Sequence, residues 1–447
     1  MESTEIPHRL GKTNIIPLMI IGGLFFIFGF VTWQNGALIP YLQMVCQLSE
    51  TEALLVTFSF YFAYTAMALP SASLIEGLGY KKSMALGLMC LVGGFLIYIP
   101  AAMNQNFSVF LLAQFIIGSG MTLLQTAANP YIVKVGPIDS AAVRIMFMGL
   151  MNKGAGVIAP LAFTAIVIGD FSGVSAVTLE AMTDVDKTAT INALSEGLIY
   201  PYIGMAIIFT ILAKLLQKSP LPEISLEDNE DQKVADSSAE SKTSILQFPS
   251  LILGALTLFF YVGAEVIAGD TIGLFASNLG VANATSLTSY TMAFMLIGYA
   301  LGIALIPHFI SQKTALISSA VSGLVFSLCV VFSDSQSFIV SEMLWGWAGL
   351  ATLPDTITFI ALLGFSNALV WPAIWPLALK GLGKFTSKGS AVLIMGISGG
   401  AILPLAYGLL SDTINGQSAY WIMIPIYLFI LFYAVIGHKV NHWGFSR

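Results

Sequence analysis

Long apolar segments separated by short polar loops make up most of this chain. Twelve of them reach about 20 residues, the length at which an α-helix crosses ~30 Å of hydrocarbon. The predicted spans are 15–42, 52–75, 82–103, 107–134, 142–168, 197–217, 248–277, 286–309, 314–332, 355–381, 388–411 and 419–437. One soluble core could not contain so many apolar helices, so the pattern predicts an all-α membrane protein with twelve transmembrane helices. The first segment is too long for a cleavable signal peptide, and we expect it to remain in the mature protein.

Composition narrows the class further. Of the 447 residues, 57% are hydrophobic and 9% are charged, whereas a soluble domain carries about 25% charged residues. Cys46, Cys90 and Cys329 are an odd number and lack metal-ligand spacing, so we expect neither a disulfide nor a zinc site. The net charge is −6 and the basic residues do not gather in one patch. We therefore expect the lipid bilayer, and no nucleic acid, as a partner.

The positive charges predict the topology. If both chain ends lie on one side of twelve spans, every Lys and Arg except Lys153 and Lys187 falls on that side. Lys187 falls on the opposite side and Lys153 lies inside a span. By the positive-inside rule, both termini are predicted to be cytoplasmic, in a multi-pass protein of the cell (inner) membrane.

A polar stretch divides the twelve spans into two sets of six. Residues 222–244 are rich in Glu, Asp and Ser, and such a composition cannot bury enough apolar area to fold. We predict an N-terminal six-helix bundle at 1–217, a cytoplasmic linker at 218–245 and a C-terminal six-helix bundle at 246–447.

Short motifs repeat between the two sets in the same order. Phe-Phe-x-x-Gly ends at Gly29 in the first span and at Gly263 in the seventh, and Gly-x-Ile-x-Pro-Leu-Ala begins at Gly156 in the fifth and at Gly400 in the eleventh. Pro130 and Lys134 likewise match Pro376 and Lys380. Transporters with repeated halves bind substrate near the membrane midplane between them.

Four motifs resemble one family of transporters. They are Gly-Phe-Val-Thr-Trp-Gln-Asn-Gly-Ala-Leu-Ile-Pro at 29–40, Gln-Thr-Ala-Ala-Asn-Pro at 125–130, Tyr-Val-Gly-Ala-Glu at 261–265 and Trp-Pro-Ala-Ile-Trp-Pro at 371–376. Together they resemble the fucose/glucose/galactose sugar:cation symporters of the major facilitator superfamily, over nearly the whole chain. The resemblance implies the major facilitator fold, with two pseudo-symmetric six-helix bundles, alternating access, and import of a monosaccharide with Na⁺ or H⁺. Hexoses and N-acetylhexosamines are the leading substrates.

Two positions depart from the family's pattern. Fucose/proton symporters of this family have an acidic residue where this chain has Gly36, and a glutamate where it has Gln125. Their protonation sites therefore do not transfer directly. When Gly29 is aligned with Gly263, however, Asp270 is the repeat partner of Gly36, so this chain has an acid at the equivalent position of the other half.

Three charged residues lie deep within the predicted spans and are candidates for ion coupling. They are Lys153, Glu265 and Asp270. An unpaired lysine there would cost about 3 kcal/mol, so Lys153 needs a counter-charge. Glu265 and Asp270 are five residues apart on one helix and point in different directions, so we expect only one of them to meet Lys153. A purely structural ion pair is the alternative, which we weight half as strongly as coupling.

Deep amides and a tryptophan pair are candidates for sugar binding. Amides bond adjacent hydroxyls, and aromatic rings cover the apolar face of a sugar. The candidates are Asn35, Gln125, Asn129, Asn152, Asn367, Trp371 and Trp375. Trp371 and Trp375 are i and i+4 and share a helix face. Interhelical hydrogen bonding is the alternative for the amides, and packing or interface anchoring for the tryptophans.

The coupling ion remains open between a proton and sodium. None of the four histidines is deep in a span, so the ion must act through carboxylate oxygens. A carboxyl could carry the proton, or Glu265 and Asp270 could ligate Na⁺ as metal ligands, and the loss of the acid at Gln125 favours sodium. We expect no other cofactor, and a monomer.

Three other functions are weighed against symport. A proton-coupled multidrug exporter of the same superfamily would share the topology, but its cavity would carry fewer amides. An intramembrane enzyme would be a protein of a different class, but the sequence contains no His-Glu-x-x-His or Gly-x-Ser-x-Gly motif. A passive channel does not need a repeat with polar residues at its centre. The chain is therefore predicted to be a transporter and not an enzyme.

Overall fold

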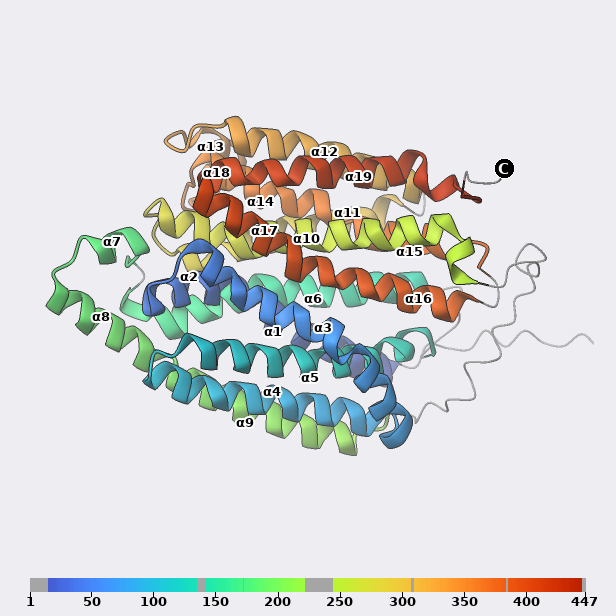
Figure 1. The fold of residues 1–447 in the computed structure, drawn as a ribbon, viewed down its shortest axis with the longest axis horizontal. Helices are drawn as coiled ribbons and strands as arrows, with labels where there is room; N and C mark the ends of the chain where they lie inside the picture. The colour runs from blue at the N-terminus through green and yellow to red at the C-terminus, as the bar shows by residue number, and fades with distance from the viewer. Residues whose placement is uncertain are drawn as a thin grey trace, which may run out of the picture.

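Twelve apolar helices run side by side along the long axis of the molecule (Figure 1). The computed structural model describes residues 15–134, 141–171, 173–221, 244–306, 309–382 and 385–443. Within these residues, 12 helices are long and apolar enough to cross a membrane. The predicted all-α membrane architecture is confirmed. Most of the predicted linker, residues 222–243, lies outside the described residues, and the domain boundaries at 217 and 246 stay predictions.

The N-terminal half forms the lower layer of Figure 1, in blue and green. Its elements are α1 (Ile15–Trp33), α2 (Asn35–Cys46), α3 (Glu50–Leu78), α4 (Tyr80–Met103), α5 (Phe107–Lys134), α6 (Ala141–Phe163), α7 (Ala176–Glu180), α8 (Asp184–Gly197) and α9 (Ile199–Lys218). The first span is interrupted at Gln34, which separates α1 from α2 by a single turn residue. Discontinuous helices of this kind often form the binding sites of transporters.

The C-terminal half forms the upper layer, in yellow to red. Its elements are α10 (Pro249–Asn278), α11 (Thr288–Leu305), α12 (Gln312–Phe332), α13 (Ile339–Trp345), α14 (Asp355–Asn367), α15 (Val370–Leu379), α16 (Thr386–Met395), α17 (Gly399–Thr413), α18 (Gly416–Ala419) and α19 (Met423–Val435). The tenth span is broken between α14 and α15, and the eleventh between α16 and α17, where residues 396–398 form a single 3-10 turn.

The sequence repeat corresponds to equivalent helix crossings. Helix α1 packs on α6 in the N-terminal half, and α10 packs on α17 in the C-terminal half. Gly29 and Gly263, the repeated glycines, lie at these two crossings, where a Cβ would meet Asn152 on α6 or Leu403 on α17. The halves meet through α3 with α17, α6 with α11, and α2 with α10.

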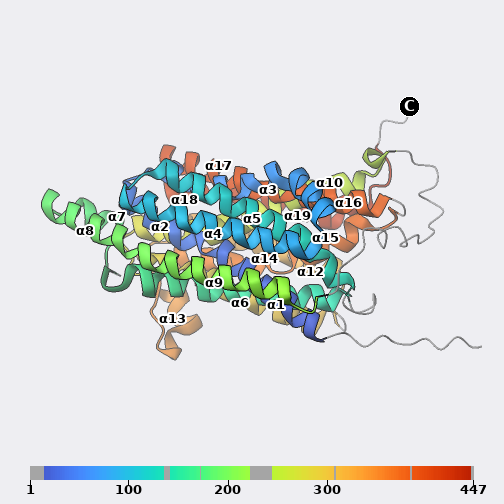
Figure 2. The same cartoon turned by 90° about the horizontal axis from the view of Figure 1, so that it is seen from below.

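The two ends of the bundle differ in charge. We call the end where α2, α10 and α17 finish and α3 begins the Glu50 end, and the opposite end, where α9 finishes and α4 begins, the Lys81 end. The described chain starts and stops at the Lys81 end, which also holds most of the lysines. Figure 2 shows α7 and α8 projecting beyond the Glu50 end.

Candidate functional site

Helix α10 is the most central element of the structure. Every residue from Tyr261 to Ser277 is buried, and the helix lies against α2, α14, α15, α17 and α19. Both deep acids are on this helix, with Glu265 8% exposed and Asp270 1% exposed. A buried charge must have partners, so the neighbours of each acid show what it can do.

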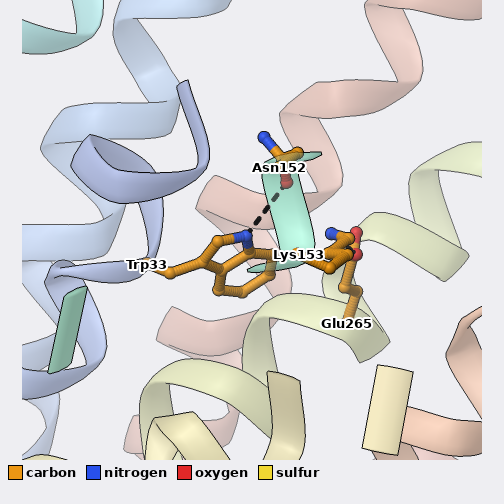
Figure 3. Close-up of polar contacts among 4 residues, drawn as sticks. All are labelled: Trp33, Asn152, Lys153 and Glu265. Atoms are coloured by element: carbon orange, nitrogen blue, oxygen red, sulfur yellow. Dashed lines mark hydrogen bonds and ion pairs between the residues drawn. The ribbon is translucent and has the colours of Figure 1, made fainter. Parts of the chain in front are cut away.

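Glu265 pairs with Lys153 across the boundary between the halves (Figure 3). Lys153 Nζ on α6 donates a 2.5 Å hydrogen bond to Glu265 Oε1. The same ammonium lies 4.4 Å from the ring centroid of Trp33, at the end of α1, in a cation–π contact. The counter-charge that Lys153 requires is therefore Glu265, and only one of the two acids meets the lysine, as predicted from their spacing.

Asp270 has a different partner. Thr57 Oγ1 on α3 donates a 2.8 Å hydrogen bond to Asp270 Oδ2, again across the boundary between the halves. A hydroxyl can donate to a carboxylate and can also accept from a protonated carboxyl, so this contact suits both forms of the acid. Asp270 thus differs from Glu265, whose partner carries a formal charge.

Gly36 and Asp270, the repeat partners, lie beside the same helix crossing. A Cβ at Gly36 would lie 2.0 Å from Thr288 Oγ1 and 2.8 Å from the carbonyl oxygen of Gly269. A Cβ at Gly273 would lie 3.0 Å from the Gly36 carbonyl oxygen. The backbones of α2 and α10 therefore meet without side chains between them. An acid at Gly36 has no room in this state, whereas Asp270 places one next to the same crossing from the other half.

A network of polar side chains joins the halves at the Glu50 end. Asp412, in the last turn of α17, accepts hydrogen bonds of 3.1 Å from the backbone N–H groups of Glu50 and Thr51. Asn278 donates to Glu50 Oε1 at 2.9 Å, and Ser411 donates to Glu50 Oε2. These four residues from three helices form what we call the Glu50 network: Glu50, Asn278, Ser411 and Asp412. It fastens α3 of one half to α10 and α17 of the other.

Two of the candidate amides are bound inside their own halves. Asn35 Oδ1 accepts a 2.6 Å hydrogen bond from Gln114, and Asn367 Oδ1 accepts a 2.9 Å hydrogen bond from Tyr427. Asn35 is 3% exposed and Asn367 is fully buried, and the amide nitrogen of each has no hydrogen-bond partner among the described residues. This arrangement matches the interhelical alternative more closely than a sugar contact.

The other three amides are more accessible. Gln125 is half-buried and donates a 2.8 Å hydrogen bond to the Tyr64 hydroxyl. Asn129, one turn further along α5, is exposed. Asn152 is half-buried and accepts a 3.2 Å hydrogen bond from Trp33 Nε1, which places it beside Lys153 (Figure 3).

The tryptophan pair packs on the helix that carries the acids. The ring centroids of Trp371 and Trp375 are 5.6 Å apart, and Trp371 lies 6.3 Å from Tyr261 on α10. Both tryptophans are half-buried. The indole nitrogen of Trp375 is buried and has no hydrogen-bond partner within the described chain.

Some partners of the site were not identified from the sequence. The sequence did not identify Thr57 as a candidate, because threonine is common in apolar spans. Its place in the site depends on a hydrogen bond to Asp270, 213 positions away. Glu50 and Asp412 lie at helix ends, where charges are expected to be solvated. Trp33 carried a signal, since it lies in the Trp-Gln-Asn-Gly part of a motif that resembles the family.

The described residues contain no cluster of three or more His, Cys, Asp or Glu side chains that could hold a metal ion. Glu265 and Asp270 are instead held separately, by an ammonium and by a hydroxyl. His8 and His308 lie outside the described residues.

Comparison with known proteins identifies the family. The model of the Major Facilitator Superfamily matches residues 19–398. The chain belongs to the major facilitator superfamily. Its resemblance to the sugar symporters of that superfamily is confirmed as well. The chain is 34% identical to the glucose/galactose transporter of Brucella abortus over 416 residues, which cover 93% of this chain and 92% of that transporter. It is 26% identical to the L-fucose-proton symporter of Escherichia coli over 405 residues, covering 90% of this chain and 88% of the symporter.

Solved structures of the superfamily have the same fold. A crystal structure of the E. coli fucose:proton symporter is 25% identical, covers 95% of this chain and 98% of its own, and superposes with a TM-score of 0.67. A superfamily transporter in the outward conformation, FucP, is 26% identical over 94% of this chain and 98% of its own, with a TM-score of 0.65. The predicted major facilitator fold is thereby confirmed.

Proposed function

We propose that this transporter imports a monosaccharide, a hexose or an N-acetylhexosamine, together with a cation. The observation that carries the proposal is the placement of two buried acids on α10, each bonded to the opposite half of the molecule. In alternating access the two halves rock about a central site, so contacts of this kind form and break during the cycle. The names of the similar transporters, for glucose/galactose and for fucose with a proton, support a sugar substrate.

Asp270 is the coupling acid in this proposal, and the Lys153–Glu265 pair is an ion pair that stabilises the joined state of the two halves. Glu265 already has a cation beside it at 2.5 Å. Asp270 has a hydroxyl partner and is 1% exposed. Burying a carboxylate without a positive partner is costly, so a cation that neutralises Asp270 favours the closed crossing of α2 with α10. Ion arrival then stabilises the state in which the halves are joined near this crossing.

A proton fits Asp270 better than sodium does. Sodium needs several oxygen ligands around one point, but the two deep carboxylates are held separately. Glu265 is paired with the Lys153 ammonium, and Asp270 bonds the Thr57 hydroxyl. A proton needs the carboxyl alone, and Thr57 can serve either form. This reverses the preference for sodium that the loss of an acid at Gln125 suggested.

The sugar is proposed to bind among the accessible polar side chains near α10. Gln125, Asn129 and Asn152 come from the N-terminal half, and Trp371 and Trp375 from the C-terminal half. The partly exposed amides offer donors and acceptors to sugar hydroxyls, and the two indole rings offer apolar faces to the sugar ring. Asn35 and Asn367 are assigned to helix packing.

The orientation follows from charge. We propose that the Lys81 end is cytoplasmic and that the Glu50 end faces outward across the inner membrane. The state described is then closed on the outside by the Glu50 network. The protein works as a monomer without a further cofactor and catalyses no chemical reaction in this proposal.

The test is uptake of radiolabelled sugars into proteoliposomes, with proton and sodium gradients imposed separately. We expect glucose or N-acetylglucosamine to accumulate only when a proton gradient is directed inward. Accumulation driven by a sodium gradient alone would show that the coupling ion is Na⁺ and not the proton. Sugar movement that is indifferent to both gradients would overturn symport, and transport of lipophilic cations in place of sugars would identify an exporter.

A further inference from the structure

A lateral groove crosses the outside of the N-terminal half between α1, α4 and α9. Its volume is about 520 Å³. Fourteen apolar residues and one serine form its wall, among them Met19, Gly23 and Phe30 on α1, and Met205 and Leu215 on α9. Several of these side chains are strongly exposed, including Met19 at 70% and Leu215 at 59%. The groove is remote from the acids on α10 and takes no part in the proposed transport site.

The groove has the depth of one membrane leaflet. Its wall runs from Met19 to Phe30 on α1 and from Met205 to Ser219 on α9, which at ~1.5 Å per residue is about 17 and 21 Å. Half of a ~30 Å hydrocarbon core is about 15 Å. Both stretches lie towards the Lys81 end of their helices. The groove therefore spans the leaflet on the side where the lysines gather.

Positive charge stands where the groove reaches that end. Lys81 Nζ donates a 2.5 Å hydrogen bond to the backbone carbonyl of Ser219, the last residue of the groove wall. Lys218 precedes Ser219 directly and is exposed, as is Lys214 beside Leu215. An apolar channel of leaflet depth with ammonium groups at its mouth matches the chemistry of an anionic phospholipid.

We propose that this groove is a binding site for one anionic phospholipid. An acyl chain lies along α1 and α9, and the headgroup phosphate binds Lys81 and Lys218. The lipid would bridge α1 to α4 and α9. It would thus steady the first half of the interrupted span whose second half, α2, crosses α10. The site is separate from sugar transport, and its test does not depend on the transported substrate.

Gly23 provides a direct test, because it lines the groove and a Cβ built there meets nothing within 4 Å. Gly23→Leu therefore places an apolar side chain in the groove from a Cβ that has room. Gly93→Leu on α4 is the matched control, since a Cβ there also meets open space but the residue does not line the groove. The purified protein is delipidated, titrated with phosphatidylglycerol or phosphatidylcholine, and the bound lipid is counted by native mass spectrometry.

We expect one phosphatidylglycerol to bind in preference to phosphatidylcholine and to be lost in Gly23→Leu but not in Gly93→Leu. Lys81→Gln with Lys218→Gln should weaken its binding by about fivefold per lysine, whereas Lys313→Gln, also at the Lys81 end, should not. The lysine variants leave the groove intact, so they decide the matter if Gly23→Leu fails to fold. Equal binding of both lipids, unchanged binding in either set of variants, or equally tight binding of soluble glycerol phosphate would overturn the proposal.

Discussion

The hydroxyl of Thr57 and the carboxylate of Asp270 are 2.8 Å apart and belong to opposite halves of the molecule. The acid is on α10 and the hydroxyl on α3, and both are almost fully buried. Because the halves must separate for the site to open to the other side, this hydrogen bond cannot persist through a transport cycle. In the proposed mechanism it links the ionic state of one carboxyl to the closure of the transporter.

Asp270→Asn is expected to abolish sugar accumulation while sugar exchange continues. The amide keeps the size of the carboxyl and can still bond Thr57, but it cannot take up or release a proton at any relevant pH. Coupling is lost although closure is retained. Gradient-driven uptake and sugar counterflow, both measured in proteoliposomes, separate the two activities. Normal accumulation by Asp270→Asn would remove Asp270 from the coupling role.

Thr57 provides the control for that experiment. Thr57→Ser keeps the hydroxyl and should preserve accumulation, whereas Thr57→Val removes it and leaves Asp270 without this partner. A loss of roughly 10- to 100-fold in the uptake rate is expected for Thr57→Val, since an unmet hydrogen bond to a charged group costs about 1.5–3 kcal/mol. Equal rates in the serine and valine variants would show that the hydroxyl is not needed.

Lys153 and Glu265 are expected to be more important for stability than for coupling. Removing one member of a buried ion pair leaves the other charge unmatched and costs about 3–5 kcal/mol, whereas removing both is far less harmful. Lys153→Met and Glu265→Gln should therefore each lower the melting temperature in detergent, and the double variant should recover most of the loss. Lys187→Gln, a change at a half-buried lysine outside this ion pair, is the control.

The prediction for Lys153 and Glu265 fails if the melting-temperature losses of the two single variants add in the double variant. Additive losses would mean that each residue acts through other neighbours, such as Trp33 for the lysine. Retained accumulation in the folded double variant would support Asp270 as the coupling acid.

The sequence predicted the helices because their signal is local. A run of about 20 apolar residues defines a membrane helix wherever its neighbours lie, and all twelve spans were found in this way. The pairing of Lys153 was also predictable, because a deep lysine needs an acid and two were available on one helix. Their spacing of five residues showed that just one could meet it.

Contacts between distant helices were not predictable from the residues alone. Asn35 and Asn367 were placed with Gln125 as deep amides, and depth along a helix is readable from sequence. The direction in which each side chain points depends on packing against partners 79 and 60 positions away. The close approach of Gly36 to Gly269 could not be predicted from the sequence for the same reason, although the repeat had already paired Gly36 with Asp270.

Asp412→Asn is expected to open the Glu50 end. The carboxylate of Asp412 accepts from two backbone N–H groups at the start of α3, where helix termini have unsatisfied donors and favour negative charge. The amide keeps one acceptor and loses the charge, so the closed state becomes less stable by about 0.5–1.5 kcal/mol. The population open at this end should rise by roughly three- to tenfold.

The reporter for this change is a cysteine at Thr285, in a protein whose native cysteines are replaced. Thr285 is 3% exposed and shares a 2.7 Å hydrogen bond with Thr164 across the boundary between the halves. Alkylation of Thr285→Cys by a membrane-impermeant maleimide should accelerate in Asp412→Asn. Asp186→Asn, which removes an acid bonded to Thr183 near its own helix start, should leave the rate unchanged. Equal rates in all three proteins would contradict a closing role for the Glu50 network.

Gln125 and Asn367 are expected to respond differently to loss of their amides. Gln125 is half-buried and bonds the Tyr64 hydroxyl, so its alanine variant should fold normally and bind sugar less tightly. Asn367 is fully buried and bonds Tyr427 within its own half. Its alanine variant should lose about 1–3 kcal/mol of stability, because the Tyr427 hydroxyl is left without this partner, while the sugar KM of the folded fraction is unchanged. Melting temperature and KM, measured on both variants, separate the roles. A normal KM in Gln125→Ala together with a raised KM in Asn367→Ala would assign sugar binding to Asn367 and helix packing to Gln125. The sugar would then bind inside the C-terminal half.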